Sequence, residues 1–140
     1  MSLIEIVIAA FILLEFSNVM ALYFAPGSKY ANAVGVFTAW EASKGYPEIH
    51  EFVRYLVYWV AGAKLIVLLL LAVIVLYGDE QLQRMSLLAL AIATSSFYWR
   101  LFPLVCKMDK AGQIEPKNYS TVLGAMILVF IVVFIVGALF

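Results

Sequence analysis

Four long apolar runs constrain the fold of this chain more than any other feature. They cover about residues 3–24, 52–77, 82–105 and 119–140. An α-helix needs roughly 20 apolar residues to cross the hydrocarbon layer of a bilayer, which is about 30 Å thick. Inside lipid the backbone must satisfy its own hydrogen bonds, and a continuous apolar run does so as a helix. We therefore predict an all-α membrane protein with four transmembrane helices in an antiparallel bundle, formed by residues 1–140 as a single domain.

The composition supports this interpretation and excludes several classes of partner. Hydrophobic residues make up 66% of the chain and charged residues only 13%, whereas the surface of a soluble domain is about 25–35% charged. Nine basic residues balance nine acidic ones, so the positive excess typical of nucleic-acid binding is absent from the sequence. One cysteine and one histidine supply no ligand set for structural zinc or paired-histidine haem. We predict no metal, no cofactor and no nucleic-acid partner.

Turn and capping residues mark the ends of the predicted helices. Pro26 and Gly27 stop the first one, because proline cannot continue a helix and glycine adopts the left-handed conformation that closes one. Pro47 suits the first turn of the second helix, which we expect to begin before the lipid does. Asp79 is the predicted N-cap of the third helix.

The segment between the first two spans predicts a short amphipathic helix over about 29–44. Apolar side chains recur there at Tyr30, Val34, Phe37 and Trp40, at steps of four, three and three, which places them on one helical face. We expect this helix to lie among the lipid headgroups or to cap the bundle. A docking site for a partner is the alternative.

The distribution of basic residues predicts the orientation in the membrane. The two larger loops, residues 25–51 and 106–118, and the adjoining helix ends hold seven of the nine basic residues. These are Lys29, Lys44, Arg54, Arg100, Lys107, Lys110 and Lys117. The opposite side has only Arg84. Because basic residues in short loops are retained in the cytoplasm, we predict cytoplasmic larger loops and both termini outside, in a plasma or inner membrane.

Glu15 and Lys64 place opposite charges at the same predicted depth. Each lies ten residues inward from the cytoplasmic end of its span, or about 15 Å at 1.5 Å per residue, which is the bilayer midplane. A charge at that depth opposes insertion by about 2.5–3.5 kcal/mol, so we expect the two groups to pair. Asn18 follows Glu15 by three residues and adds an amide to the same general face.

Three hydroxyl residues of the third span, Thr94, Ser95 and Ser96, lie slightly nearer the cytoplasm than this pair. They are candidates to join Glu15, Asn18 and Lys64 in one substrate-binding or ion-binding site, because ionisable groups at mid-membrane depth are functional candidates by default. The alternative is that the ion pair is purely structural and that the hydroxyls bond back to carbonyls of their own helix.

Basic residues near the predicted cytoplasmic boundary suggest a second site. Arg54, Arg100 and Lys107 are long enough to reach lipid phosphates from the helix ends. We expect them to hold an anionic lipid headgroup.

One short motif of the first span resembles a known family. The run Ile12-Leu13-Leu14-Glu15 is similar to the small multidrug-resistance transporters, whose membrane glutamate alternates between protons and cationic substrates. The resemblance implies a proton-linked role for Glu15. It covers this motif alone, and the long first loop and Lys64 depart from the family pattern, so no family is assigned. Membrane-associated glutathione and eicosanoid enzymes and DoxX-like proteins are similar in size and hydropathy only.

Together these features predict a small-solute or proton-linked transporter or binding protein that uses Glu15, Asn18 and Lys64. We expect a homo-oligomer or a subunit of a larger membrane complex, because four helices alone enclose little volume for a substrate. The alternative is a non-catalytic accessory or assembly subunit, in which the same residues lock the helices together. An enzyme is the third possibility.

Overall fold

The computed structural model describes residues 2–140, and within them the chain forms helices joined by short loops. The helices are α1 (Leu3–Phe24), η1 (Val34–Val36, a 3-10 turn), α2 (Thr38–Ser43), α3 (Pro47–Tyr77), α4 (Glu80–Ser95), α5 (Phe97–Lys110) and α6 (Tyr119–Leu139). Among these residues extended pairing is limited to an isolated bridge between Phe37 and Ile114.

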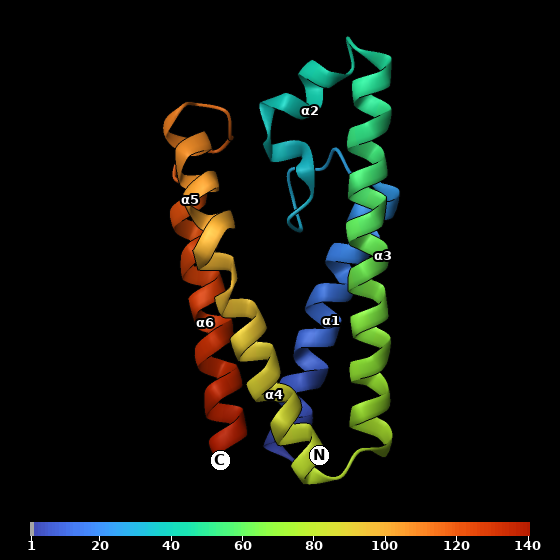
Figure 1. Cartoon of the computed structure of the whole chain (residues 1–140), viewed down its shortest axis with the longest axis vertical. Helices are drawn as coiled ribbons and strands as arrows, with labels where there is room; N and C mark the ends of the chain where they lie inside the picture. The colour runs from blue at the N-terminus through green and yellow to red at the C-terminus, as the bar shows by residue number, and fades with distance from the viewer. Residues whose placement is uncertain (1) are drawn as a thin grey trace.

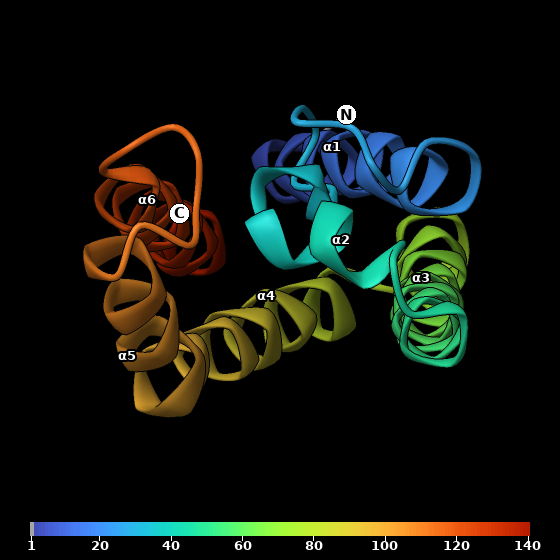
Figure 2. The ribbon, with the colours of Figure 1, turned by 90° about the horizontal axis from the view of Figure 1, so that it is seen from above.

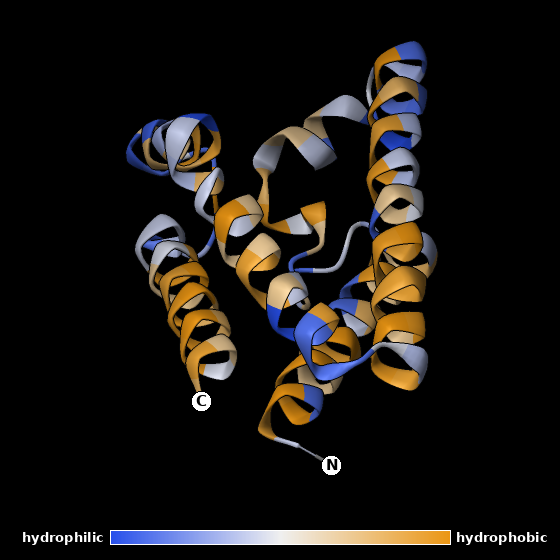
Figure 3. Ribbon diagram, turned by 60° about the horizontal axis from the view of Figure 1, so that its bottom comes forward, coloured by the Kyte–Doolittle hydropathy of each residue, from blue (hydrophilic) through white to orange (hydrophobic). Residues whose placement is uncertain are grey.

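Four of the described segments are long and apolar enough to cross a membrane: α1, α3, α4 together with α5, and α6. Hydrophobic residues make up the second half of α3 and most of α6, whereas hydrophilic residues gather in loops and at helix ends (Figure 3). A helix that is hydrophobic all round is typical of a membrane span. The prediction of an all-helical chain with four candidate spans is therefore confirmed.

The long helices form two packed groups that meet at one end and diverge toward the other (Figure 1). In the first arm α1 packs along α3, and in the second arm α4 and α5 pack along α6. Both termini lie at the end where the arms meet (Figure 1). The first loop, residues 25–46, contains α2 and lies between the arms at the other end (Figure 1, Figure 2).

The arms are joined by a core built from all the spans. Its buried members are Ile4 and Ile8 of α1, Leu71 of α3, Leu87 and Ala91 of α4, and Phe134 and Ala138 of α6. Phe11 packs edge-on against Phe134 with ring centroids 5.0 Å apart, a geometry that adds about 0.5–1.5 kcal/mol to the burial. A Cβ on Gly137 would lie 3.1 Å from Leu87, so this small residue lets α4 and α6 approach closely, as is common between membrane helices.

A second core fixes α1 against α3 and thereby positions the candidate site. Its buried residues are Val19 and Leu22 of α1 and Val57, Ala61 and Leu68 of α3. Ala61 is completely buried, and its small side chain allows the two backbones to come close. Side chains near the middle of α1 therefore face those near the middle of α3.

The prediction of one amphipathic helix over 29–44 is wrong. Residues 29–33 are not helical, and Ala31 and Asn32 adopt left-handed backbone angles, with φ of 54° and 55°. Helical structure starts only at η1 and α2. Val36 is buried against Val105 and Ile114, and Gly35 fits so tightly that a Cβ there would overlap the carbonyl of Gly27. Long-range packing has overridden the local periodicity, which predicted one continuous helix that lies among the lipid headgroups or caps the bundle.

The third span differs from a single helix over 82–105, because it bends between α4 and α5. The break falls at Ser96, and Pro103 lies inside α5 without ending it. Ser95 and Ser96 donate their hydroxyl hydrogens to the carbonyls of Ala91 and Ala93, at 2.7 and 2.6 Å. Serine pairs that compete for backbone carbonyls are a known cause of helix bends.

Two predicted helix starts are confirmed. α3 begins at Pro47, which occupies its first turn, where the missing N–H of proline costs nothing. Asp79 caps α4, since its Oδ1 accepts a hydrogen bond from the backbone N–H of Leu82 at 2.8 Å.

Candidate functional site

Three of the residues singled out in the sequence come together between α1 and α3. Lys64 Nζ lies 2.6 Å from Glu15 Oε2 and donates a second hydrogen bond to Asn18 Oδ1, also at 2.6 Å. Glu15 and Asn18 are one helical turn apart on α1, and Lys64 lies opposite them on α3. Charge-assisted hydrogen bonds of this length are stronger than neutral ones.

Asn18 links the ion pair to the first loop. Its side chain is buried, and its amide nitrogen donates to the backbone carbonyl of Ala31. The left-handed conformation of Ala31 belongs to the turn that brings this carbonyl to α1. Both ends of the Asn18 amide are therefore engaged, one by Lys64 and one by the loop.

The ion pair is not sealed from its surroundings. The side chain of Glu15 is 20% exposed and that of Lys64 is 36% exposed. The hydrogen bonds of the described residues engage Oε2 of Glu15 but not Oε1, and every buried side-chain polar atom among them has a partner. Oε1 is thus an accessible acceptor at the edge of the pair.

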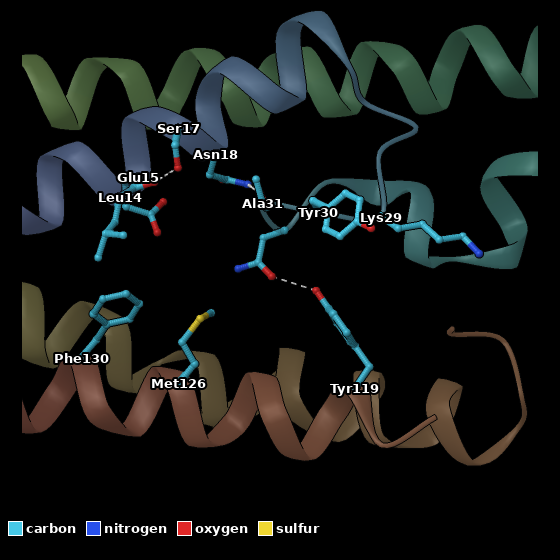
Figure 4. A pocket seen from close by; sticks show the side chains of 11 residues that line it. Leu14, Glu15, Ser17, Asn18, Lys29, Tyr30, Ala31, Tyr119, Met126 and Phe130 are labelled. Carbon is cyan, nitrogen blue, oxygen red and sulfur yellow. Dashed lines mark hydrogen bonds between the residues drawn. The ribbon is translucent and has the colours of Figure 1, made fainter. Parts of the chain in front are cut away.

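A pocket of about 390 Å³ opens beside Glu15, between α1, the first loop and α6 (Figure 4). It is lined by Leu14, Glu15, Ser17, Asn18, Lys29, Tyr30, Ala31, Asn32, Tyr119, Met126 and Phe130. In Figure 4 Glu15 reaches in from α1, and Met126 and Phe130 face it from α6. One wall is therefore polar and charged, and the wall opposite is apolar. We call this the central pocket.

Lys64 does not line the central pocket but does line two others. The first, of about 380 Å³, combines Lys64 and Asn18 with aliphatic side chains of α1 and α3 such as Leu22 and Val57. The second, of about 280 Å³, contains both Lys64 and Glu15. Glu15 therefore lines the central pocket without Lys64, Lys64 lines the pocket of about 380 Å³ without Glu15, and the third pocket is lined by both.

Polar contacts across the arms lie at the loop end of the central pocket. Tyr119 of α6 donates its hydroxyl hydrogen to Asn32 Oδ1 at 2.8 Å, and Lys29 Nζ lies 3.0 Å from Glu115 Oε2. Backbone hydrogen bonds from Glu115 to Val36 and from Thr38 to Gln113 join the same two loops. The first loop is thus held to the second arm by side-chain and backbone contacts.

The hydroxyl residues of the third span are not joined to this cluster. Within residues 2–140, hydrogen bonds from Ser95 and Ser96 go to carbonyls of their own helix, and Thr94 lines neither the central pocket nor the pockets at Lys64. The structure therefore does not bring these three residues together with Glu15. The alternative, bonding back to the helix, describes Ser95 and Ser96.

The three candidate lipid-headgroup residues lie on two helices, Arg54 on α3 and both Arg100 and Lys107 on α5. Arg54 of α3 donates to the hydroxyl of Tyr58 at 3.1 Å and stacks over its ring at 5.6 Å. Arg100 of α5 lies 5.5 Å from the ring centre of Trp99, and Lys107 is exposed in the last turn of α5. Their binding of one lipid stays a prediction.

Several residues of the central pocket were missed by sequence reasoning. Asn32 and Tyr119 face each other from segments 87 positions apart, and Met126 and Phe130 belong to a span with no polar pattern to mark its orientation. From the sequence, Tyr119 is recognisable only as an aromatic residue at the start of a span, where aromatic residues are common. Among residues 2–140 no group of three or more His, Cys, Asp or Glu side chains is placed to hold a metal ion.

Comparisons of the chain with protein-family models, with curated proteins and with solved structures find no match. The chemistry of the Glu15–Asn18–Lys64 cluster and of its pockets is therefore the basis for assigning a function.

Proposed function

We propose that this chain is a small integral membrane protein that binds a small solute beside Glu15, Asn18 and Lys64 and moves it in a proton-linked cycle. The observation that carries the proposal is the position of Glu15 in the wall of the central pocket. A solute that enters the pocket meets a carboxylate with one free oxygen, next to an amine that already balances its charge.

The energetic cost of the pair supports a role beyond structure. Each charge near the centre of a bilayer opposes insertion by about 2.5–3.5 kcal/mol, and a buried ion pair is often no more stabilising than apolar residues of the same volume. Leucine at both positions would favour insertion. A charged pair that borders an open pocket can instead exchange partners, because a proton or a solute ion competes with Lys64 for Glu15.

The arrangement of the arms suits such a cycle. The central pocket lies between α1 of the first arm and α6 of the second, and the apolar core that the arms share lies next to it, toward the end where the arms meet. A tilt of one arm about that core changes the width of the pocket. We further propose that both termini face outside, that the larger loops are cytoplasmic, and that the protein works as an oligomer.

Proton movement in liposomes tests this function. The full chain is reconstituted with a pH-sensitive dye inside the vesicles, and gradients of small cationic, anionic and neutral solutes are imposed. We expect at least one solute class to drive proton flux with the native chain, and Glu15→Gln to abolish it. Ser86→Ala is the matched control, because Ser86 bonds only to Leu82 of its own helix. Equal solute-driven flux for Glu15→Gln and the native chain would remove Glu15 from the mechanism.

A second candidate is a non-catalytic accessory or assembly subunit. It is favoured by the bond from Asn18 to Ala31, because the cluster then serves to hold the first loop between the arms. Stoichiometric co-purification of a partner protein from native membranes, without solute-driven proton flux, would support this function over transport.

A further inference from the structure

The central pocket exposes an entering solute to the acid rather than to the amine. Glu15 lines it and Lys64 does not, and Glu15 Oε1 is the oxygen that Lys64 leaves free. Met126 and Phe130 lie across the pocket from Glu15 (Figure 4). The acidic wall therefore favours a positive charge, and the apolar wall opposite suits the hydrocarbon part of an organic solute.

The other ionisable groups around the pocket do not reverse this preference. Lys29 lines it from the first loop but is paired with Glu115 at 3.0 Å. Tyr30 and Tyr119 add phenol groups, not carboxylates or amines, to the lining. Glu15 is the only acidic side chain that lines the pocket from the described residues.

Charge balance then decides where the exchanged proton resides. With Glu15 ionised and Lys64 protonated, the pair is neutral. A monovalent cation that binds Glu15 leaves one positive charge in excess in a medium of low dielectric constant, which is costly. Protonation of Glu15 without a cation creates the same excess, because Lys64 loses its counter-charge. Only loss of the proton from Lys64 restores neutrality while the cation is bound.

We propose that the solute is a monovalent organic cation and that Lys64, not Glu15, is the group that releases the exchanged proton. This inference rests on the proposed function. The cation forms an ion pair with the Glu15 carboxylate, and one Nζ–H bond of Lys64 breaks. The electron pair stays on the nitrogen and the proton passes to water. The neutral amine still has hydrogens to donate to Asn18 Oδ1.

The pockets provide separate routes for the two ions. The cation occupies the central pocket beside Glu15. The proton leaves Lys64 through the pocket of about 380 Å³, which Lys64 lines beside Asn18 and Glu15 does not line. Exchange is then electroneutral, one proton for one cation.

Proton release on cation binding tests the assignment. The probe is benzyltrimethylammonium, which has no N–H and cannot itself supply a proton. Its binding to the purified full chain in detergent micelles is measured by isothermal titration calorimetry, in two buffers of different ionisation enthalpy at the same pH. We expect about one proton released per cation bound, as charge neutrality requires. Neopentylbenzene, the neutral isostere, should release none.

Two substitutions at Lys64 distinguish the release of its proton from the presence of its positive charge. Lys64→Arg keeps the positive charge, but arginine cannot be deprotonated in proteins. We expect it to release no proton and to bind the probe about tenfold more weakly or worse, because the excess charge remains. Lys64→Met removes the positive charge that opposes the cation and should bind the probe more tightly than Lys64→Arg. Glu15→Gln should not bind it saturably.

The outcomes distinguish this inference from the proposed function. Probe binding without proton release, or equal release by Lys64→Arg, would overturn the role of Lys64. Liposome flux driven only by neutral or anionic solutes would overturn the cation assignment and leave proton-linked transport standing. Absence of flux with every solute class would overturn the proposed function itself.

Discussion

Tyr119, the first residue of α6, donates its hydroxyl hydrogen to Oδ1 of Asn32 in the first loop at 2.8 Å. The bond joins the first loop to the second arm at the loop end of the central pocket. The ring of Tyr119 also packs edge-on against Phe37 of the same loop, with centroids 6.5 Å apart.

Removal of this hydroxyl tests whether the bond limits the width of the central pocket. Tyr119→Phe keeps the ring and removes the hydrogen bond, so we expect a loss of about 0.5–1.5 kcal/mol in the free energy of unfolding. If the bond restrains the arms, solute-driven proton flux in liposomes should rise. Val122→Ala, at an exposed position one turn further along α6, is the control. Flux equal to that of the native chain would show that the hydrogen bond between Tyr119 and Asn32 has a structural role only.

Asn18 should be more important for stability than its neighbours on α1. Asn18→Leu leaves the Ala31 carbonyl and one hydrogen of Lys64 without their partner, and an orphaned polar group costs about 1–3 kcal/mol. Denaturant unfolding in micelles measures the loss. Ser17→Ala is the matched control, because Ser17 is exposed and bonds only to Leu14 of its own turn. Equal stability of the two variants would contradict the linking role of Asn18.

The ion pair should show strong energetic coupling. Glu15→Leu and Lys64→Leu each leave one uncompensated charge, and we expect each to lower the free energy of unfolding by about 2–3 kcal/mol. The double variant should recover most of that loss. Glu41 and Lys44, paired at 2.8 Å on the exposed face of the first loop, provide a surface comparison worth about 0–1 kcal/mol. Additive losses at Glu15 and Lys64 would contradict a direct interaction.

Gly35 should be the least replaceable glycine of the first loop. A Cβ there would overlap the backbone of Gly27 and Ser28, so Gly35→Ala must displace the loop, and we expect a loss of about 2–4 kcal/mol. Gly45→Ala is the control, because its Cβ would make an ordinary contact of 3.6 Å with Ala42. Tryptophan fluorescence reports the rearrangement, because Trp40 in this loop is buried, whereas Trp59 and Trp99 are already exposed. Unchanged emission and stability of Gly35→Ala would contradict the packing of this loop.

The orientation in the membrane can be measured by cysteine labelling. Cys106 is the only cysteine of the chain, so Cys106→Ser gives a background for Gln81→Cys and Lys110→Cys, both at exposed positions. An impermeant maleimide applied to intact cells should label position 81 and not position 110, because basic loops are retained in the cytoplasm. Labelling of position 110 alone would invert the proposed topology.

Part of the candidate site could be predicted because helical rise is regular. Ten residues inward from each predicted boundary place Glu15 and Lys64 at one depth, and their side chains meet at 2.6 Å. Thr94, Ser95 and Ser96 lie at a similar predicted depth, but they do not join this pair, and Ser95 and Ser96 bond to carbonyls of α4 instead. Depth along a helix follows from residue number, but the direction in which a side chain points depends on the rotation of the helix against its neighbours.

The sequence alone determined that the chain is helical and how many spans it can form, because long apolar runs can satisfy their backbone hydrogen bonds locally. The tertiary structure decided the fold of the first loop, the bend at Ser96 and the walls of the central pocket. These features depend on residues distant in the sequence, such as Asn32 with Tyr119 and Val36 with Ile114. Local periodicity carries no information about such contacts, since they arise only when separate helices pack.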